Sequence, residues 1–288
     1  MDRLLFGDNQ FFGVNHMSEE KARAQAMRFQ SLDTIMSVLD AAHDVGIRTF
    51  MCTTHDRIAD VVDRMRSEPS HYQGRAFYPC MPYAHKYANA MAESGVFGAI
   101  KQFLPDGGFL DAAMRGGKSF AGKDVEGMIT LLIDAEMSMF DGMDTPVIFL
   151  QNVVVDFLLG MGFTEAFRIF SDYVSTKFKA EPGFITMNMP RLLDALDAVG
   201  VDNPIVCSNI NKIGFRMSGG IDVYLDALHN RKFRAIAMSI FASGAIPPDE
   251  AVGSVTSLPN IESIVFFASS RSNINSTSEL VGRYWPPH

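Results

Sequence analysis

The stretch that decides the fold is Gly183–Ser208, GFITMNMPRLLDALDAVGVDNPIVCS. A short apolar run, Gly183–Asn188, is followed by an amphipathic segment, Arg191–Val199, and then by a second apolar run, Pro204–Ser208. Short apolar runs without polar alternation are typical of strands that are buried on both faces, as they are in parallel sheets. The stretch therefore predicts a strand, a helix and a second strand parallel to the first.

The same strand–helix unit recurs along the whole chain. The expected strands are Leu4–Phe6, Arg48–Cys52, Arg75–Cys80, Pro146–Gln151, Gly183–Asn188, Pro204–Ser208, Arg234–Ile240 and Ser263–Phe267. The expected helices are Leu32–Val45 (closed by Gly46), Ile58–Arg66, Val125–Phe140, Gly162–Phe178, Arg191–Val199, Ile221–His229, Pro248–Ser257 and Asn273–Tyr284. Eight such units in 288 residues predict an α/β fold, a (β/α)8 TIM barrel formed by a single domain, 1–288. An open doubly wound sheet is the alternative, but no early Gly-x-Gly-x-x-Gly turn supports it.

One connection, residues 81–123 after the third strand, is much longer than the others. It is rich in glycine and contains short helical patterns. A connection of this length inside a compact domain is usually functional or an inserted subdomain. We therefore expect an inserted helical segment within the barrel.

Composition excludes several classes of protein. Hydrophobic residues make up 47% of the chain and charged residues 20%, so a large core is expected. The net charge of −8 and the isoelectric point near 5.3 give no electrostatic basis for binding nucleic acid or an anionic membrane. The N-terminus lacks the pattern of a signal peptide, and the longest apolar stretch, Pro146–Phe163, is too polar to cross a bilayer. Three widely spaced cysteines, Cys52, Cys80 and Cys207, favour a reducing cytoplasm over a disulfide framework.

Polar residues gather where a TIM barrel places its active site, after the carboxyl ends of the strands. Asp8 follows the first strand and Thr53 and Thr54 follow the second, in a rim that also holds three of the seven histidines. Amides and other polar side chains there suggest a pocket for a small polar, anionic or polyhydroxylated molecule. The substrate-binding candidates are Asn9, Gln10, His16, His85, Gln151, Asn152, Asn188, Asn209 and Lys212.

The segment Val265–Asn273, VFFASSRSN, passes from a strand into a helix that we expect to begin near Asn273. N–H groups at a helix N-terminus bind anions, and Arg271 with the neighbouring serines would add donors and charge. Barrels often hold a phosphate at the loops after strands seven and eight. A phosphate site is therefore expected here, with an ordinary N-cap by Ser or Asn as the alternative.

Three stretches resemble the aldo-keto reductases: LDAAHDVGIRTF (Leu39–Phe50), AMSIFASG (Ala237–Gly244) and SIVFFASS (Ser263–Ser270). The resemblance covers roughly half the chain. It implies a barrel oxidoreductase that uses NADP(H) and binds the cofactor at the ends of strands seven and eight. The cofactor-binding residues implied are Ser239, Ser243, Ala268, Ser269, Ser270 and Arg271.

The catalytic residues of that family are not preserved. Its aspartate falls on Met51, its tyrosine near Asp56, its lysine on Cys80 or Met81, and its histidine on Gln151 or Asn152. A reductase still needs a group to protonate the oxyanion that hydride attack produces. The candidates are His55, which we favour, Lys86, Tyr83 and Asp56.

Three other functions remain open. His16, His55 and His85 could converge on a metal and support hydrolase, lyase or isomerase chemistry, but their spacing does not lead us to predict a metal. Lys212 could form a Schiff base, although pairing with an anionic substrate fits its loop position better. A barrel without catalytic residues could also bind a ligand without turnover.

Overall fold

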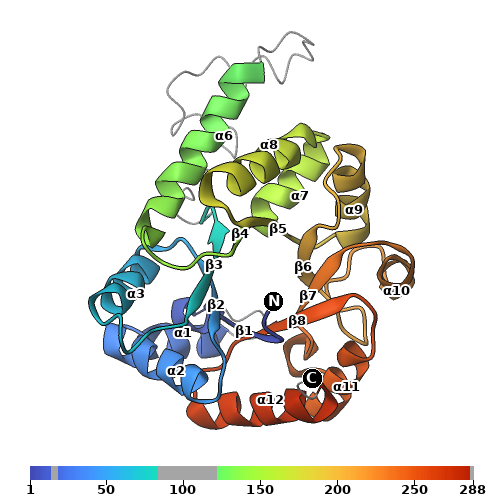
Figure 1. Cartoon of the computed structure of the whole chain (residues 1–288). Coiled ribbons are helices and arrows are strands. Elements are labelled where there is room, and N and C mark those ends of the chain that lie inside the picture. The colour runs from blue at the N-terminus through green and yellow to red at the C-terminus, as the bar shows by residue number, and fades with distance from the viewer. Residues whose placement is uncertain (14–18, 84–121, 286–288) are drawn as a thin grey trace.

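In the computed structural model, which describes residues 1–13, 19–83 and 122–285, eight parallel strands close into a barrel (Figure 1). The strands are β1 (Leu4–Gly7), β2 (Thr49–Thr53), β3 (Ala76–Met81), β4 (Val147–Leu150), β5 (Glu181–Thr186), β6 (Ile205–Asn209), β7 (Arg234–Met238) and β8 (Ile261–Phe266). β1 completes the barrel by pairing with β2 on one side and β8 on the other. The TIM barrel expected from the strand–helix alternation is confirmed.

Two apolar layers stabilise the barrel. Its interior is filled by side chains from the strands: Leu5, Met51, Tyr78, Cys80, Val147, Phe149, Ile185, Ile205, Cys207 and Ile236. A larger cluster, which includes Phe6, Phe50, Phe77 and Phe184, lies between the outer face of the strands and the helices. Each buried side chain of this size contributes about 1.5–3 kcal/mol, which explains why the strand sequences are apolar on both faces.

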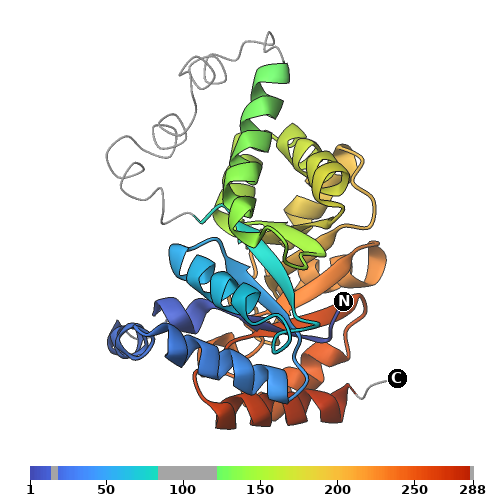
Figure 2. The ribbon, with the colours of Figure 1, turned by 60° about the vertical axis from the view of Figure 1, so that its left-hand side comes forward.

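The barrel is surrounded by helices (Figures 1 and 2). They are α1 (Glu19–Arg28), α2 (Leu32–Asp44), α3 (Asp56–Ser67), α6 (Gly122–Met137), α7 (Asn152–Met161), α8 (Glu165–Tyr173), α9 (Met189–Ala198), α10 (Ile221–Asn230), α11 (Pro248–Thr256) and α12 (Arg271–Tyr284), with the short turns η1 (Asn9–Phe12), η3 (Ser138–Phe140), η4 (Val174–Phe178) and η5 (Ala242–Gly244). α2 buries Ile35, Leu39 and Ala42 as its period predicts, and Gly46 follows it with a φ of 86°. Beside β3 and β4, α6 extends beyond the barrel (Figure 2). No helix in the described ranges is long and apolar enough to cross a membrane.

Several expected boundaries were wrong. Residues 152–161, which follow β4, were expected to form a loop before the helix Gly162–Phe178. They form the helix α7 instead. α7 was missed because valine and leucine occupy most of its faces, so its apolar residues show no clear helical period. α12 begins at Arg271 rather than Asn273. Cys52 and Cys80, the expected last residues of their strands, each lie one residue before the end of β2 and β3, and all three cysteines are buried.

The expected insertion, residues 81–123, is only partly described. Met81 is the last residue of β3 and Gly122 the first residue of α6. Residues 84–121, with the short helical pieces predicted in them, lie outside the described residues. The division into one domain stays a prediction.

Candidate active site at the barrel mouth

The ends of β1, β2 and β3 bring together a carboxyl, an imidazole and a phenol. Asp8 directly follows β1, Thr53 ends β2, His55 lies just before α3, and Tyr83 follows β3. Parallel strands place their carboxyl ends at the same end of a barrel, where TIM-barrel enzymes hold their active sites. Of these residues, His55 and Tyr83 are catalytic candidates expected from the sequence.

Asp8 is a buried acid without a charged partner among the described groups that act on its pKa. Its side chain is 5% exposed, and its Oδ2 accepts hydrogen bonds from the backbone N–H and the hydroxyl of Thr53, each at 2.7 Å. Burial raises the pKa of Asp8 above the ordinary value, and the two Thr53 bonds offset only part of the rise. Sequence reasoning assigned Asp8 no role, although an acid directly after an apolar strand was a usable signal.

The loop after β1 also contains Gln10, a buried polar side chain whose burial does not stabilise the fold. Gln10 is fully buried, and its Nε2 donates to the carbonyl of Gly7 at 2.9 Å. Among the residues that the structure describes, its Oε1 is buried without a hydrogen-bond partner, which costs about 1–3 kcal/mol. The neighbouring candidate Asn9 begins η1, and its carbonyl accepts from the Gly13 N–H. A buried acceptor without a donor suits a site that binds a ligand with N–H or O–H groups.

His55 caps α3 through its ring. Its Nδ1 accepts a hydrogen bond from the Arg57 backbone N–H at 2.9 Å. A neutral ring that accepts at Nδ1 carries its proton on Nε2. In this arrangement Nδ1 is the acceptor of the cap, and the ring proton on Nε2 can act as a donor.

The His55 ring is also held by aromatic neighbours. It stacks on Phe12, with ring centroids 4.3 Å apart, and meets the Tyr83 ring edge-on at 4.9 Å. Burial and the nearby Asp8 raise the pKa of Tyr83, so its phenol stays protonated. The structure thus brings together two of the four catalytic candidates, His55 and Tyr83. Asp56 is exposed in the first turn of α3, and Lys86 lies outside the described residues.

Tyr83 is positioned by a buried glutamate that sequence reasoning missed. The Tyr83 N–H lies 3.1 Å from Thr54 Oγ1 and 3.3 Å from Glu136 Oε2, and the Thr54 hydroxyl donates to the same carboxylate. Glu136 is 2% exposed and lies near the end of α6. Its contacts tie the β2 and β3 ends to α6. The sequence around Glu136 shows only a helical pattern and offers no signal for this role.

Three of the six predicted substrate-binding amides, Gln10, Asn188 and Asn209, form side-chain hydrogen bonds with the backbone of the described chain. Asn188 caps α9 by accepting from the Arg191 N–H at 3.4 Å, and Asn209 donates to the Arg216 carbonyl at 3.1 Å. Gln151 is the N-cap residue of α7, and Asn152 is that helix's first residue. Lys212 forms an ion pair with Glu250 of α11. The assignment of these residues to a substrate site therefore stays a prediction. It also stays a prediction for His16 and His85, which lie outside the described residues.

The ends of β7 and β8 carry serines and strained backbone. Ser239, Ala242 and Ser243 have left-handed φ values of 56°, 45° and 59°. Such conformations cost about 1–3 kcal/mol each in non-glycine residues and gather at ligand-binding sites. Ser269 and the N-terminus of α12 follow β8, at the same end of the barrel as these residues. Ala268, which directly precedes Ser269, is buried.

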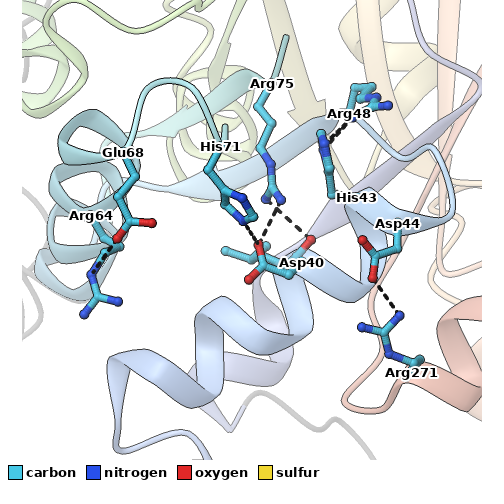
Figure 3. A network of polar contacts seen from close by, with 10 residues as sticks. Asp40, His43, Asp44, Arg48, Arg64, Glu68, His71, Arg75 and Arg271 are labelled. Atoms are coloured by element: carbon cyan, nitrogen blue, oxygen red, sulfur yellow. Dashed lines mark hydrogen bonds and ion pairs between the residues drawn. The ribbon is translucent and has the colours of Figure 1, made fainter. Parts of the chain in front are cut away.

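Two of the proposed phosphate ligands have other partners. Ser270 caps α12 by accepting from the Asn273 N–H at 3.3 Å, the alternative role that the sequence had left open. The Arg271 guanidinium lies 2.7 Å from Asp44 of α2 (Figure 3) and lowers the pKa of that carboxyl. Both side chains of this pair are more than half exposed, so the ion pair is weak in water.

The structure describes only part of the proposed three-histidine metal site. His55 is described, whereas His16 and His85 are not. Within the described ranges, no three or more His, Cys, Asp and Glu side chains come together in a way that would hold a metal ion. The metal alternative therefore stays untested at this set of residues.

Comparisons with known proteins place the fold. No protein-family model matches the chain, and no curated protein matches its sequence. Solved structures do match: a candidate aldo-keto reductase from Pseudomonas aeruginosa has a TM-score of 0.60 at 10% identity, over 98% of this chain and 90% of that one. An aldo-keto reductase from Bacillus halodurans, in its holo form, has a TM-score of 0.54 at 8% identity, over 97% and 86%. One from Brucella melitensis has a TM-score of 0.53 at 9% identity, over 96% and 88%.

The chain therefore has the (β/α)8 barrel of the aldo-keto reductases, at very low sequence identity to them. The resemblance expected from the sequence is confirmed at the level of the fold.

Proposed function

We propose that the protein is an oxidoreductase of the aldo-keto reductase type that interconverts a small polar carbonyl compound and its alcohol with NADP(H). The observation that carries the proposal is the grouping of Asp8, His55 and Tyr83 at the mouth of a barrel that matches solved aldo-keto reductases along nearly its whole length. The buried free cysteines agree with the reducing cytoplasm expected from the sequence.

The residues that would hold the cofactor phosphates are Ser239, Ser243, Ala268, Ser269, Ser270 and Arg271. When bound, the reduced nicotinamide supplies a hydride to a carbonyl carbon. The chain itself has to bind the substrate, orient its carbonyl and provide a proton to the oxygen. A neutral His55 suits the orienting role, because Nε2–H donates a hydrogen bond without giving up its proton.

We expect His55→Ala and His55→Asn to lower kcat by about 10²–10³, since alanine removes the proposed hydrogen-bond donor and the shorter asparagine cannot place its amide N–H where Nε2–H lies. The two variants differ in stability. Asparagine is a good N-cap, so His55→Asn keeps the α3 cap, whereas His55→Ala loses about 1 kcal/mol. Steady-state kinetics with urea denaturation would separate the two effects. Full activity in His55→Asn would contradict a role for the imidazole.

We expect NADP(H) to raise the melting temperature and Arg271→Ala to abolish most of the rise, because the guanidinium is the main charge available to a phosphate there. Ligand at 100 times its Kd stabilises by about 2.7 kcal/mol. Asp44→Asn is the matched control, since it removes the carboxylate that competes for Arg271 and should preserve or enlarge the shift. If no phosphorylated ligand raises the melting temperature, the proposed anion site is wrong. If the melting temperature rises but no aldehyde or ketone is reduced, a barrel that binds a ligand without turnover is favoured.

A further inference from the structure

We propose that Asp8 is the acid–base residue of the barrel mouth, giving a proton from Oδ1 to the oxygen of a substrate carbonyl, and that Thr53 tunes when this proton is available. The inference rests on the proposed carbonyl reduction and names the group that completes it. In that reaction the carbonyl carbon gains a hydride from a dihydronicotinamide, which is oxidised to the nicotinamide cation. The C=O π bond breaks, and the oxygen takes the proton from Asp8, leaving a carboxylate that solvent reprotonates.

The hydrogen bonds of Asp8 direct the proton to one oxygen. Both donors of Thr53, the backbone N–H and the hydroxyl, lie 2.7 Å from Oδ2. An oxygen that accepts two such bonds is a poor place for a proton, which favours protonation on Oδ1; the backbone N–H of Asp8 also bonds the carboxyl group and lowers its pKa. Asp8 in this form is an O–H donor at the end of β1, held in place by the end of β2.

The groups near Asp8 are Thr53 and Cys52 of β2, Cys80 of β3 and Tyr83. Burial favours the protonated form of Asp8, whereas the two bonds from Thr53 favour the carboxylate. Burial, and then the charge of Asp8, raise the pKa of both thiols, so Cys52 and Cys80 stay neutral. In the part of the chain that the structure describes, no cation contributes to the pKa of Asp8. Because a buried charge without a counter-ion is unfavourable, the carboxyl keeps its proton to higher pH than an ordinary aspartate.

A purely structural role would not need this acid. An asparagine would accept the same two Thr53 donors without burying a charge, so above the raised pKa of Asp8 the ionised carboxyl is less favourable at this site than an amide. A perturbed carboxyl at the end of a barrel strand, close to Tyr83 and through it to His55, is the arrangement expected of a catalytic acid.

The experiment compares wild type with Asp8→Asn and Thr53→Val, using NADPH and a panel of small polar aldehydes and ketones. For wild type, kcat/KM should fall tenfold per pH unit above the pKa of Asp8. Asp8→Asn should lower kcat by about 10²–10⁴ and lose this limb of the profile. Thr53→Val removes one donor to the carboxylate, so it should move the limb to higher pH.

A second pair at the opposite end of the same strands provides the control. Asp2 Oδ2 accepts from the Thr49 hydroxyl at 2.6 Å, just before β1 and at the start of β2. Asp2→Asn should leave the shape of the pH profile unchanged. Altered limbs in Asp2→Asn as well would mean that the profile reports barrel stability, and would overturn the assignment of Asp8.

Carboxyl carbon NMR gives a readout that needs no turnover. The signal that Asp8→Asn removes should titrate well above the ordinary aspartate range in wild type, and higher still in Thr53→Val. Stability should follow the same pKa. The contribution of Asp8 is fully present below the pKa of an unfolded aspartate and is lost as pH rises through the raised folded value. The melting temperature of Asp8→Asn should therefore exceed that of wild type at neutral pH, and the gap should close in acid.

The outcomes separate the two proposals. An ordinary or lowered pKa for Asp8, or an unchanged pH limb in an active Asp8→Asn, overturns the role of Asp8 and leaves carbonyl reduction standing. A wild-type protein that reduces no carbonyl compound overturns the proposed function and this role with it. If Asp8→Asn does not fold, the pH limbs of kcat/KM for wild type and Thr53→Val still decide, because both proteins keep the carboxyl and their comparison needs no NMR assignment.

Discussion

Gly183→Ala is expected to lower the free energy of unfolding by about 3 kcal/mol, the upper end of what overpacking a core costs. Gly183 lies in β5 and faces the barrel interior. A Cβ there would lie 2.4 Å from Cε1 and 2.5 Å from Cδ1 of Phe149, well inside van der Waals contact. Phe149 is fully buried and packs against the Tyr78 ring at 5.9 Å, so it has little room to move.

Urea denaturation of three variants tests this prediction. Gly160→Ala, in an exposed turn of α7 where a Cβ meets nothing within 4 Å, should instead stabilise by up to about 1 kcal/mol through helix propensity. Adding Phe149→Leu to Gly183→Ala should recover part of the loss, because the smaller side chain vacates the clashing volume. A Gly183→Ala protein as stable as wild type would show that the interior layer is not packed as described.

Tyr224→Ala is expected to lower the free energy of unfolding by about 5 kcal/mol, combining a large cavity with lost hydrogen bonds. Tyr224 of α10 is fully buried. Its hydroxyl donates to the Met187 carbonyl at 2.9 Å and accepts from the Met189 N–H at 3.2 Å. These bonds tie α10 to the end of β5 and the start of α9.

Tyr224→Phe separates the two contributions, because it keeps the ring and removes the hydroxyl. It should lose about 1–2 kcal/mol, the cost of leaving the Met187 and Met189 backbone groups unsatisfied. Calorimetry or urea denaturation measures both variants. Equal losses in Tyr224→Phe and Tyr224→Ala would mean that the ring contributes nothing, contrary to its burial.

The units of the barrel could be read from the chain because their signals are local. In Gly183–Ser208, the change from an apolar run to a helical period and back matches β5, α9 and β6 within two residues at each boundary. α7 was not predicted because it is apolar on most faces, so its sequence shows neither a strand period nor a helix period. Strand length was also overestimated there: β4 stops at Leu150, after which Gln151 and Asn152 begin the helix.

The order of the strands predicted the position of some residues of the candidate site but not their contacts. Placing polar residues after strands located His55 and Tyr83 correctly at the mouth, because every parallel strand delivers its carboxyl end there. The same reasoning assigned Arg271 to a phosphate but missed that Asp44, from α2, lies beside it. It also passed over Glu136, whose contact with the Tyr83 N–H joins residues 53 positions apart.

The sequence by itself determined the class of fold, the order of its elements and the end of the barrel where chemistry can occur, since each depends on periodicity and chain direction. Only the tertiary structure decided which polar groups meet and which stay charged. Asp8 and Thr53 are 45 positions apart, and nothing in either segment specifies the other. Their contact and their burial arise when the barrel closes, and the pKa that makes Asp8 a candidate acid depends on that burial.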